Sequence, residues 1–410
     1  MTDLRCTVNR EWVRANSQAM LFVAVDLVPA PTQVAAGSYQ SSNIALAIDC
    51  SGSMAGEKFE QAVEAACLLA RSLSPSDWIS VVSFETKVRV VVPPTQASQT
   101  RDVENAIRGI HPGSETDLYG GLERAYEQVC TMAGSPGVVS RIVMLTDGQA
   151  NRGKTKERDL VAICNQIRQY GITVTNLGIG DDYNEKLLTQ MALAGGGLWY
   201  HVSDPYSLPQ LFQQQVTEMR GTVLRNPQLS VSLMPNAQFV DIYSVRPILT
   251  RLDKVDLSRS ACMIPLRDIL VGEEQNLVFR VRFPSSPAGR YPLLRADLGG
   301  RSQEVYVTTT DDPGQYSRET NPYPTVLMRA SEGTMILQKG LDGDTVALRQ
   351  AQTIVRALEN DPNAQTALRS SATAQDAVTR LRQGVDTAAT RVLTDSERKA
   401  IKERTTIRRR

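Results

Sequence analysis

The sequence predicts an α/β domain with a doubly wound, mostly parallel sheet, which is inserted in a β-sandwich and followed by a C-terminal helical region. Three observations support this fold class. Short apolar strands alternate with amphipathic helices between residues 42 and 220, strand-like segments flank that region, and the chain after residue 323 has helical periodicity. The predicted boundaries are 1–41 for N-terminal strands, 42–220 for the α/β domain, 221–312 for the sandwich and 323–406 for the helices. A chain of 410 residues is long enough for two or three domains.

The first strong strand signal is the apolar run at residues 20–28. This run is too apolar to stay exposed and too short to form a core alone. We therefore expect it to complete the sandwich, whose other predicted strands are 228–233, 239–245, 275–283 and 304–309.

The α/β segment begins with the apolar run 44–48, which ends at Asp49 and reads as a buried parallel strand. Helices and strands then alternate. The predicted helices are 57–73, 118–132, 159–170, 185–194 and 207–220, and the predicted strands are 78–84, 88–92, 139–146, 172–179 and 198–202.

The C-terminal region follows a linker at residues 311–324 that is rich in Asp, Asn, Pro and Gly. Residues 326–339 and 344–359 are predicted to form a helix pair, with Asp344 as the N-cap of the second helix. A third helix is predicted over 364–382, and a fourth begins near Thr394.

Polar side chains follow two predicted strands of the α/β segment. Asp49, Ser51 and Ser53 come directly after the first strand, Asp147 follows the strand 139–146, and Thr116 precedes the helix at 118. Ligand sites in open parallel sheets gather at the carboxyl ends of strands, so these residues are expected to converge. Two carboxylates together would repel unless a cation lay between them. Because every donor is an oxygen, the pattern favours Mg²⁺, Mn²⁺ or Ca²⁺ over zinc.

The pattern Asp49-x-Ser51-x-Ser53, Thr116 and Asp147 resembles the DxSxS…T…D motif of the von Willebrand factor A family, and the match covers residues 42–220. The flanks Ser51-Gly-Ser-Met-Ala-Gly56, 116–122, Leu145-Thr-Asp-Gly148 and 174–180 resemble its bacterial members, and the flanking β segment and helical tail resemble those of bacterial stand-alone members. The resemblance implies an intact metal-ion-dependent adhesion site. It implies that Ser51, Ser53 and Thr116 contact the metal directly, that Asp49 and Asp147 often act through water, and that one position is left for a partner's carboxylate.

The sequence leaves three functions to compare. The first is a metal-dependent module that binds proteins and is not an enzyme. The second is a hydrolase or phosphoryl-transfer enzyme that uses Asp49 as nucleophile, but position +2 is Ser51, not a second acid, and the sequence has no P-loop lysine motif. The third is a helical scaffold with an inert α/β domain. Cys50 has no histidine near it in sequence and is interpreted as a packing residue.

Two other acidic positions have ordinary structural interpretations. Asp117 is interpreted as a helix N-cap, and Asp181-Asp182 as a turn in preference to a second cation site.

The net charge of +1 gives no field that would attract nucleic acid or an anionic membrane. The six cysteines are scattered, no stretch is long and apolar enough to span a membrane, and the first residues lack the apolar core of a secretion signal. We therefore expect a cytoplasmic protein, with a basic end at 402–410 that is solvated. The expected partner presents an exposed Asp or Glu. Resemblance to bacterial members leaves an AAA+ ATPase, a kinase–phosphatase pair and a defence system open as its assembly.

Overall fold

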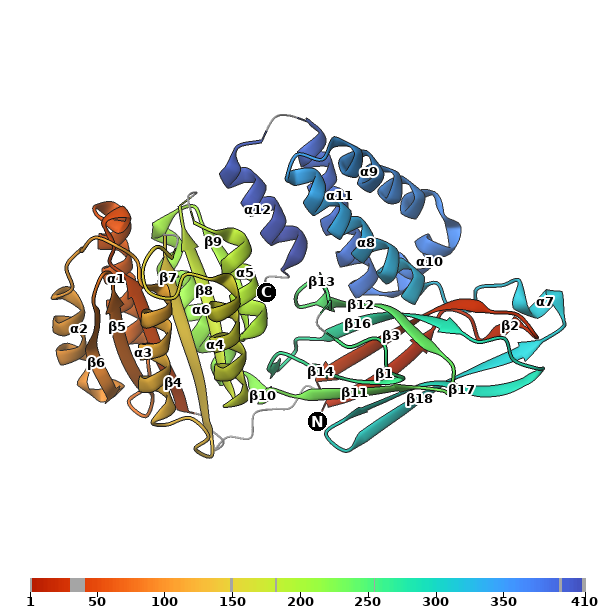
Figure 1. Cartoon of the computed structure of the whole chain (residues 1–410), viewed down its shortest axis with the longest axis horizontal. Helices are drawn as coiled ribbons and strands as arrows, with labels where there is room; N and C mark the ends of the chain where they lie inside the picture. The colour runs from red at the N-terminus through yellow and green to blue at the C-terminus, as the bar shows by residue number, and fades with distance from the viewer. Residues whose placement is uncertain are drawn as a thin grey trace. The chain divides into compact units, whose positions relative to one another are not determined.

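The computed structural model describes residues 2–29, 41–147, 150–180, 183–253, 255–390 and 393–407. The chain divides into two compact units (Figure 1). Unit 1 comprises residues 1–31 and 227–410, and unit 2 comprises residues 32–226. The chain therefore leaves unit 1 after its first strands and returns to it about 200 residues later.

Unit 2 is built on a six-stranded sheet with the order β6-β5-β4-β7-β8-β9. Its strands are β4 (Ser41–Asp49), β5 (Trp78–Phe84), β6 (Val88–Gln96), β7 (Val138–Thr146), β8 (Ile172–Ile179) and β9 (Gly196–Val202), with a short β10 (Thr222–Leu224) after the last helix. The helices are α1 (Glu57–Ser72), α2 (Thr100–Arg108), α3 (Leu118–Cys130), α4 (Glu157–Gln169), α5 (Glu185–Ala194) and α6 (Leu208–Arg220).

The sheet of unit 2 is parallel except for the antiparallel pair β5 and β6. Helices α3, α4 and α5 pack against one face, while α1 and α6 pack together on the other (Figure 1). Both faces of β4 and β7 are thus covered, which explains why nearly every residue of these strands is buried. The short helix α2 has no counterpart among the predicted elements.

The order of the strands reverses at β4. The chain passes from β4 through α1 to β5 on one side, and it later adds β7 on the other side. The carboxyl ends of β4 and β7 therefore lie next to each other at a topological switch point, where open α/β sheets bind their ligands.

Unit 1 contains two five-stranded sheets with the orders β1-β3-β16-β12-β13 and β14-β11-β17-β18-β2. The strands of the first sheet are β1 (Thr2–Val8), β3 (Ala19–Pro29), β12 (Gln238–Arg246), β13 (Thr250–Arg251) and β16 (Gln275–Phe283). Those of the second are β2 (Trp12–Arg14), β11 (Gln228–Leu233), β14 (Ala261–Pro265), β17 (Gly289–Leu298) and β18 (Arg301–Thr310), and a short β15 (Ile269–Leu270) follows β14.

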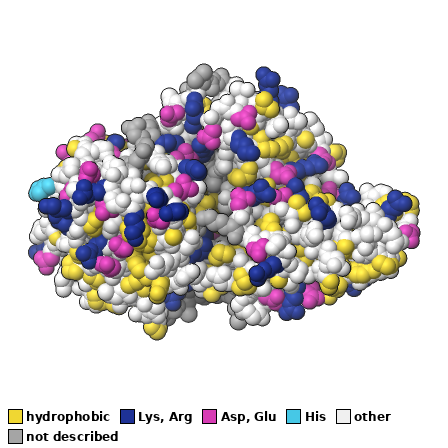
Figure 2. Space-filling model, in the orientation of Figure 1, with side chains coloured by type: hydrophobic (Ala, Val, Ile, Leu, Met, Phe, Trp, Pro, Cys, Tyr) yellow, Lys and Arg dark blue, Asp and Glu magenta, His cyan; other side chains and the backbone are white. Residues whose placement is uncertain are grey.

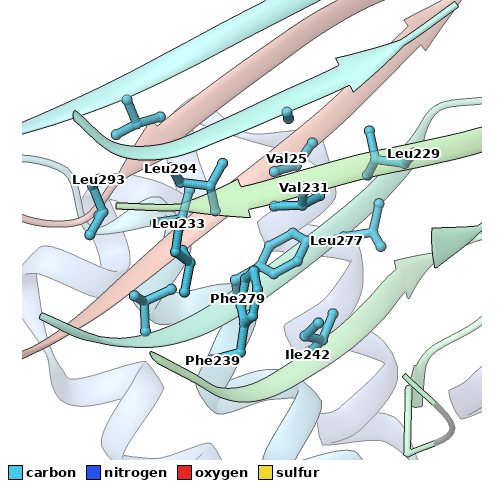
Figure 3. Packing of buried hydrophobic residues seen from close by; sticks show 14 of the residues in the cluster. Val25, Leu229, Val231, Leu233, Phe239, Ile242, Leu277, Phe279, Leu293 and Leu294 are labelled. Carbon is cyan, nitrogen blue, oxygen red and sulfur yellow. The ribbon is translucent and has the colours of Figure 1, made fainter. Parts of the chain in front are cut away.

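The N-terminal strands are integral to these sheets. Strand β3 pairs with β1 on one side and with β16 on the other, both antiparallel, and β2 pairs with β18. Side chains from both sheets form one hydrophobic cluster, in which Val25 of β3 lies with Val231 and Phe279 (Figure 3). The apolar run predicted at residues 20–28 is thus buried against strands that follow unit 2 in the sequence.

The helices of unit 1 follow the sheets. They are α7 (Pro313–Tyr316), α8 (Tyr323–Leu341), α9 (Thr345–Asn360), α10 (Pro362–Ser370), α11 (Ala372–Thr390) and α12 (Asp395–Thr406). Asp344 caps α9 as predicted, and Thr394 caps α12 through a capping box. Helix α8 packs on the outer face of the first sheet, where Leu327 lies in the same cluster as Ala24 and Val278.

The single helix predicted over residues 364–382 is wrong. Two helices, α10 and α11, divide this segment, because Ser371 has an extended backbone with φ −132° and ψ 113°. The first of them also begins earlier than predicted, since Asp361 caps it and Pro362 occupies its first position.

The surface in view carries positive and negative side chains in alternation, without a large patch of one sign (Figure 2). None of the helices in the described residues is long and apolar enough to cross a membrane. All six cysteines are free thiols.

Leu27 tests whether β3 is required by the core of unit 1. Its side chain is 0% exposed, so Leu27→Ala should lower the free energy of unfolding by about 2–5 kcal/mol. Met20 lies on the same strand but is 42% exposed, and Met20→Ala should change it by less than about 0.5 kcal/mol. Urea denaturation followed by circular dichroism measures both, and equal losses would contradict the assigned burial.

Candidate metal centre

Asp49 is the last residue of β4, and its side chain lies fully inside the protein with 0% exposure. Both of its carboxylate oxygens accept hydrogen bonds. The backbone N–H of Ser51 donates to Oδ1 at 2.9 Å, and the Thr146 hydroxyl donates to Oδ2 at 2.6 Å. The end of β7 and the loop after β4 therefore fix the orientation of this carboxylate.

Asp147 follows β7 and is buried as well. Its Oδ1 accepts a hydrogen bond of 2.8 Å from the Ser53 hydroxyl, which lies 3.2 Å from the hydroxyl of Ser51. A chain of polar contacts thus runs from Asp49 through Ser51 and Ser53 to Asp147. Ser53 is an exposed residue, so the two buried carboxylates are joined through a residue that solvent reaches.

Thr116 lies on a neighbouring loop that backbone hydrogen bonds attach to the loop after β4. The Gly113 N–H donates to the Cys50 carbonyl at 2.5 Å, and the Gly52 N–H donates to the Ser114 carbonyl at 3.0 Å. The Thr116 N–H donates to the Asn151 side chain at 2.7 Å, and Thr116 is buried. Within the described residues its hydroxyl makes no hydrogen bond to Asp49, Ser51, Ser53 or Asp147, so only its loop is joined to them.

The electrostatics of the two carboxylates show the expected conflict. Burial raises the pKa of Asp49 from 3.8 to about 6, although the hydrogen bonds from Thr146 and Ser51 lower it, and the charge of Asp147 raises it further. At neutral pH the Asp49 carboxyl is largely ionised, and the free-energy cost of burying that charge is what raises its pKa. A cation beside the two carboxylates would remove that cost.

Lys58 is a functional candidate that the sequence analysis missed. Its ammonium group, on the first turn of α1, lies 3.0 Å from Oδ2 of Asp147 and is about one-third exposed. Gly180 leaves room for it, because a Cβ there would lie 3.0 Å from the Lys58 nitrogen. A lysine in the first turn of a helix is unfavourable for the helix dipole, and this departure from the usual preference was a usable signal.

Asn151 and Thr146 were also missed as positioning residues, since each acts only through a contact that depends on the fold.

The other interpretations of polar residues have mixed outcomes. Asp117 caps α3, with its side chain accepting from the Gly120 N–H, as predicted. Cys50 is buried, and burial raises the pKa of its thiol to about 11, which agrees with a packing role. Gly148, the pair at 181–182 and residues 408–410 lie outside the described residues. The solvated basic end predicted at 402–410 is wrong for its first part, because residues 402–406 belong to α12, Lys402 pairs with Asp342 at 2.7 Å, and Ile407 is buried.

The arrangement fits a hard divalent cation. Two carboxylates and two serine hydroxyls meet at one point of the sheet edge, all of them oxygen donors, and the buried charge of Asp49 and Asp147 calls for a positive counterpart. Neutral hydroxyls leave much of the ion's charge uncompensated, so the ion would remain electrophilic toward an anionic group from solvent.

Unit 2 is an α/β domain whose candidate metal centre lies at the carboxyl ends of two adjacent parallel strands. Residues 43–214 match the family model of the von Willebrand factor type A domain. Protein sll0103 of Synechocystis sp. is 24% identical over 286 residues, which cover 69% of this chain and 65% of that protein. Protein YfbK of Escherichia coli is 25% identical over 197 residues, which cover 48% of this chain and 34% of that protein. The matches thus span less than two thirds of either relative.

A solved structure extends the similarity to the whole chain. The von Willebrand factor type A protein from Catenulispora acidiphila aligns with 100% of this chain and 97% of its own chain, with a TM-score of 0.75 and 19% identity. At this identity the similarity shows a common fold. Unit 2 is therefore similar to the von Willebrand factor type A domains over residues 43–214.

Thr146→Val tests the hydrogen bond that supports Asp49. Removing the hydroxyl leaves one oxygen of a buried carboxylate without its donor, so the free energy of unfolding in excess EDTA should fall by about 1.5–3 kcal/mol. Thr189→Val is the matched control, because the Thr189 hydroxyl donates only to a carbonyl of its own helix. A Thr146 variant as stable as this control in urea denaturation would show that Asp49 does not depend on the bond.

Proposed function

We propose that this protein is a metal-dependent protein-interaction module, an adaptor that binds a partner's carboxylate through a divalent cation. Ser51, Ser53 and Thr116 would provide hydroxyl ligands, and Asp49 and Asp147 would balance the charge, often through water. Mg²⁺ is the proposed ion, with Mn²⁺ or Ca²⁺ as alternatives that take the same donors. When bound, the ion supplies a positive centre that an anionic group can approach.

The observation that carries this proposal is the chain of polar contacts from Asp49 to Asp147, which has buried carboxylates at both ends and the exposed residue Ser53 between them. Mg²⁺ takes about six ligands, and water would fill the positions that the protein leaves open. A partner carboxylate can replace one water in a charge-assisted contact. The partner should therefore present an exposed Asp or Glu to the loops 51–53, 113–117 and 147–151.

The enzyme alternative uses Asp49 as a nucleophile, and the geometry favours it less. Asp49 is fully buried, and both of its oxygens already accept hydrogen bonds from Ser51 and Thr146. A nucleophile must reach its substrate with a free lone pair. Asp49 is better placed to orient ligands than to attack a phosphoryl or acyl group.

We also propose how the two units are connected and in which kind of assembly the protein acts. The shared core of the two sheets supports a β-sandwich in unit 1 into which the von Willebrand factor A domain is inserted. The similarity to bacterial proteins supports a role in a bacterial, cytoplasmic assembly, whose other members would be an AAA+ ATPase, a kinase–phosphatase pair or defence-system components.

The metal is tested first. Isothermal calorimetry should show one Mg²⁺ or Mn²⁺ site per chain that is lost in Asp49→Ala, because the buried charge that balances the ion is gone. Asp204→Ala is the control, since Asp204 caps a short helix elsewhere in unit 2. Unchanged binding in Asp49→Ala would overturn the proposed site, and a partner whose affinity holds in EDTA would overturn the binding mechanism.

Lys58→Met tests how the lysine changes the affinity of the site for Mg²⁺. The ammonium group shares Asp147 with any ion at the site. Removing it should tighten Mg²⁺ binding by about three- to tenfold, because a nearby positive charge and a rival for the carboxylate both disappear. The same variant should melt lower than the wild type in EDTA and lose this deficit at saturating Mg²⁺.

Arg152→Gln is the control for a general charge effect. Arg152 is about half-exposed and pairs with Glu115 at 2.6 Å on the neighbouring loop, so it contacts neither buried carboxylate. It should alter the affinity for Mg²⁺ less than Lys58→Met does. Weaker Mg²⁺ binding in Lys58→Met would show instead that the lysine holds Asp147 in its ligating orientation.

A further inference from the structure

Unit 1 contains a pocket of about 460 Å³ that belongs to no site described so far. It lies between the segment 9–22, which contains β2 and the start of β3, and the segment 316–329, which joins α7 to α8. The two segments are attached to each other, because the Asn321 N–H donates to the Asn9 carbonyl at 3.0 Å and the Glu11 N–H donates to the Thr320 hydroxyl at 2.8 Å. Helix α7 also lies beside β2 (Figure 1).

Three arginines line the pocket. Arg10 and Arg14 are exposed, and the side chain of neither has a hydrogen bond or an ion pair with any residue in the described ranges. Arg329 has a single long contact, 3.4 Å to Asp361. A pocket that holds guanidinium groups without partners is suited to a carboxylate or a phosphate, which arginine binds with two parallel hydrogen bonds.

The only acidic side chain among the lining residues, Glu319, does not neutralise these arginines. Its carboxylate accepts hydrogen bonds from the Asn9 amide at 3.3 Å and from the Thr325 hydroxyl. Asn9 and Thr325 are both buried, so Glu319 is held toward the wall of the pocket. The lining residues therefore carry an excess of positive charge.

The floor of the pocket is apolar. Met20 and Phe22 lie on the outer face of β3, the face that helices cover further along at Ala24. This cover is missing at the beginning of the strand, where Met20 is 42% exposed. The guanidinium of Arg280 lies over the Phe22 ring, 5.7 Å from its centre. An exposed methionine beside unpaired arginines is typical of a binding surface, since methionine adapts to varied apolar groups.

We propose that this pocket binds a short acidic segment of a partner protein. Carboxylates of the segment contact Arg10 and Arg14, and an apolar side chain next to them packs on Met20 and Phe22. The volume suits a few residues of peptide. A free phosphate would use the arginines but leave the apolar floor unfilled, so the combination of charge and apolar surface favours a peptide. This site lies in unit 1, contains no proposed metal ligand, and does not rest on the proposed metal-dependent function.

Fluorescence anisotropy with the full chain tests the proposal. The probe is a short labelled peptide in which glutamate and leucine alternate, measured in excess EDTA and in Asp49→Ala so that the metal site contributes nothing. We expect saturable binding that weakens at least tenfold in the double variant Arg10→Gln/Arg14→Gln and severalfold in Met20→Ser. Arg356→Gln, which removes an exposed arginine of α9, should bind as the wild type does.

Variant peptides test the acidic and the apolar part of the segment separately. A peptide with glutamine in place of glutamate should bind at least tenfold more weakly, and one with serine in place of leucine severalfold more weakly. Equal binding of the glutamine peptide, or undiminished binding in the double arginine variant whose circular dichroism is unchanged, would overturn the site. If inorganic phosphate displaces the peptide at comparable concentration and the serine peptide binds equally, the pocket takes a simple anion and the peptide assignment is wrong.

Discussion

Two carboxylates buried a short distance apart constrain the whole of unit 2. Asp49 and Asp147 end adjacent parallel strands, and neither side chain reaches bulk solvent. Burial without compensation would cost several kcal/mol per charge. The protein offsets this cost with donors to each oxygen: a backbone N–H and a threonine hydroxyl for Asp49, and a serine hydroxyl and the Lys58 ammonium for Asp147. The raised pKa of Asp49 shows that its burial is not fully offset.

The topology explains why this constraint arises where it does. The chain crosses from β4 to β5 on one side and reaches β7 on the other, so the segments that leave β4 and β7 start at adjacent strand ends. Ser53, in the short helix Gly52–Met54 after β4, contacts Asp147 after β7. Hydrogen bonds from Gly113 and Gly52 attach the loop that contains Thr116 to the segment after β4. Any other residue at position 113 would displace Glu85, because its Cβ would lie 2.6 Å from the Glu85 side chain. The sheet thus positions the ends of the strands, and backbone contacts bring the loops together.

Much of this arrangement could be predicted from local patterns. The strand ending at Asp49, the strand before Asp147 and the N-cap at Asp117 each depend on a few neighbouring residues, and they lie where the pattern indicated. Asn151 could not be found in this way, because its contact joins residues that are 35 positions apart. The contact of Lys58 with Asp147 spans 89 positions, and its place in the first turn of α1 was the local signal for it. The break at Ser371 escaped prediction because the apolar periodicity continues across it, whereas the cap formed by Asp361 and Pro362 was readable in the sequence.

The N-terminal strands show how a local pattern can also predict a distant partner. Residues 20–28 are too apolar to be exposed, so they required partners, which β1 and β16 provide. In the structure β3 lies between β1 and β16, and its alternation divides the strand: Leu21, Val23 and Val25 face the shared core, whereas Met20 and Phe22 face outward. The same period of two that buries one set of side chains exposes the other. Helix α8 covers this outer face only from its own beginning at Tyr323, and Met20 remains accessible beside the arginines as a direct consequence of where that helix starts.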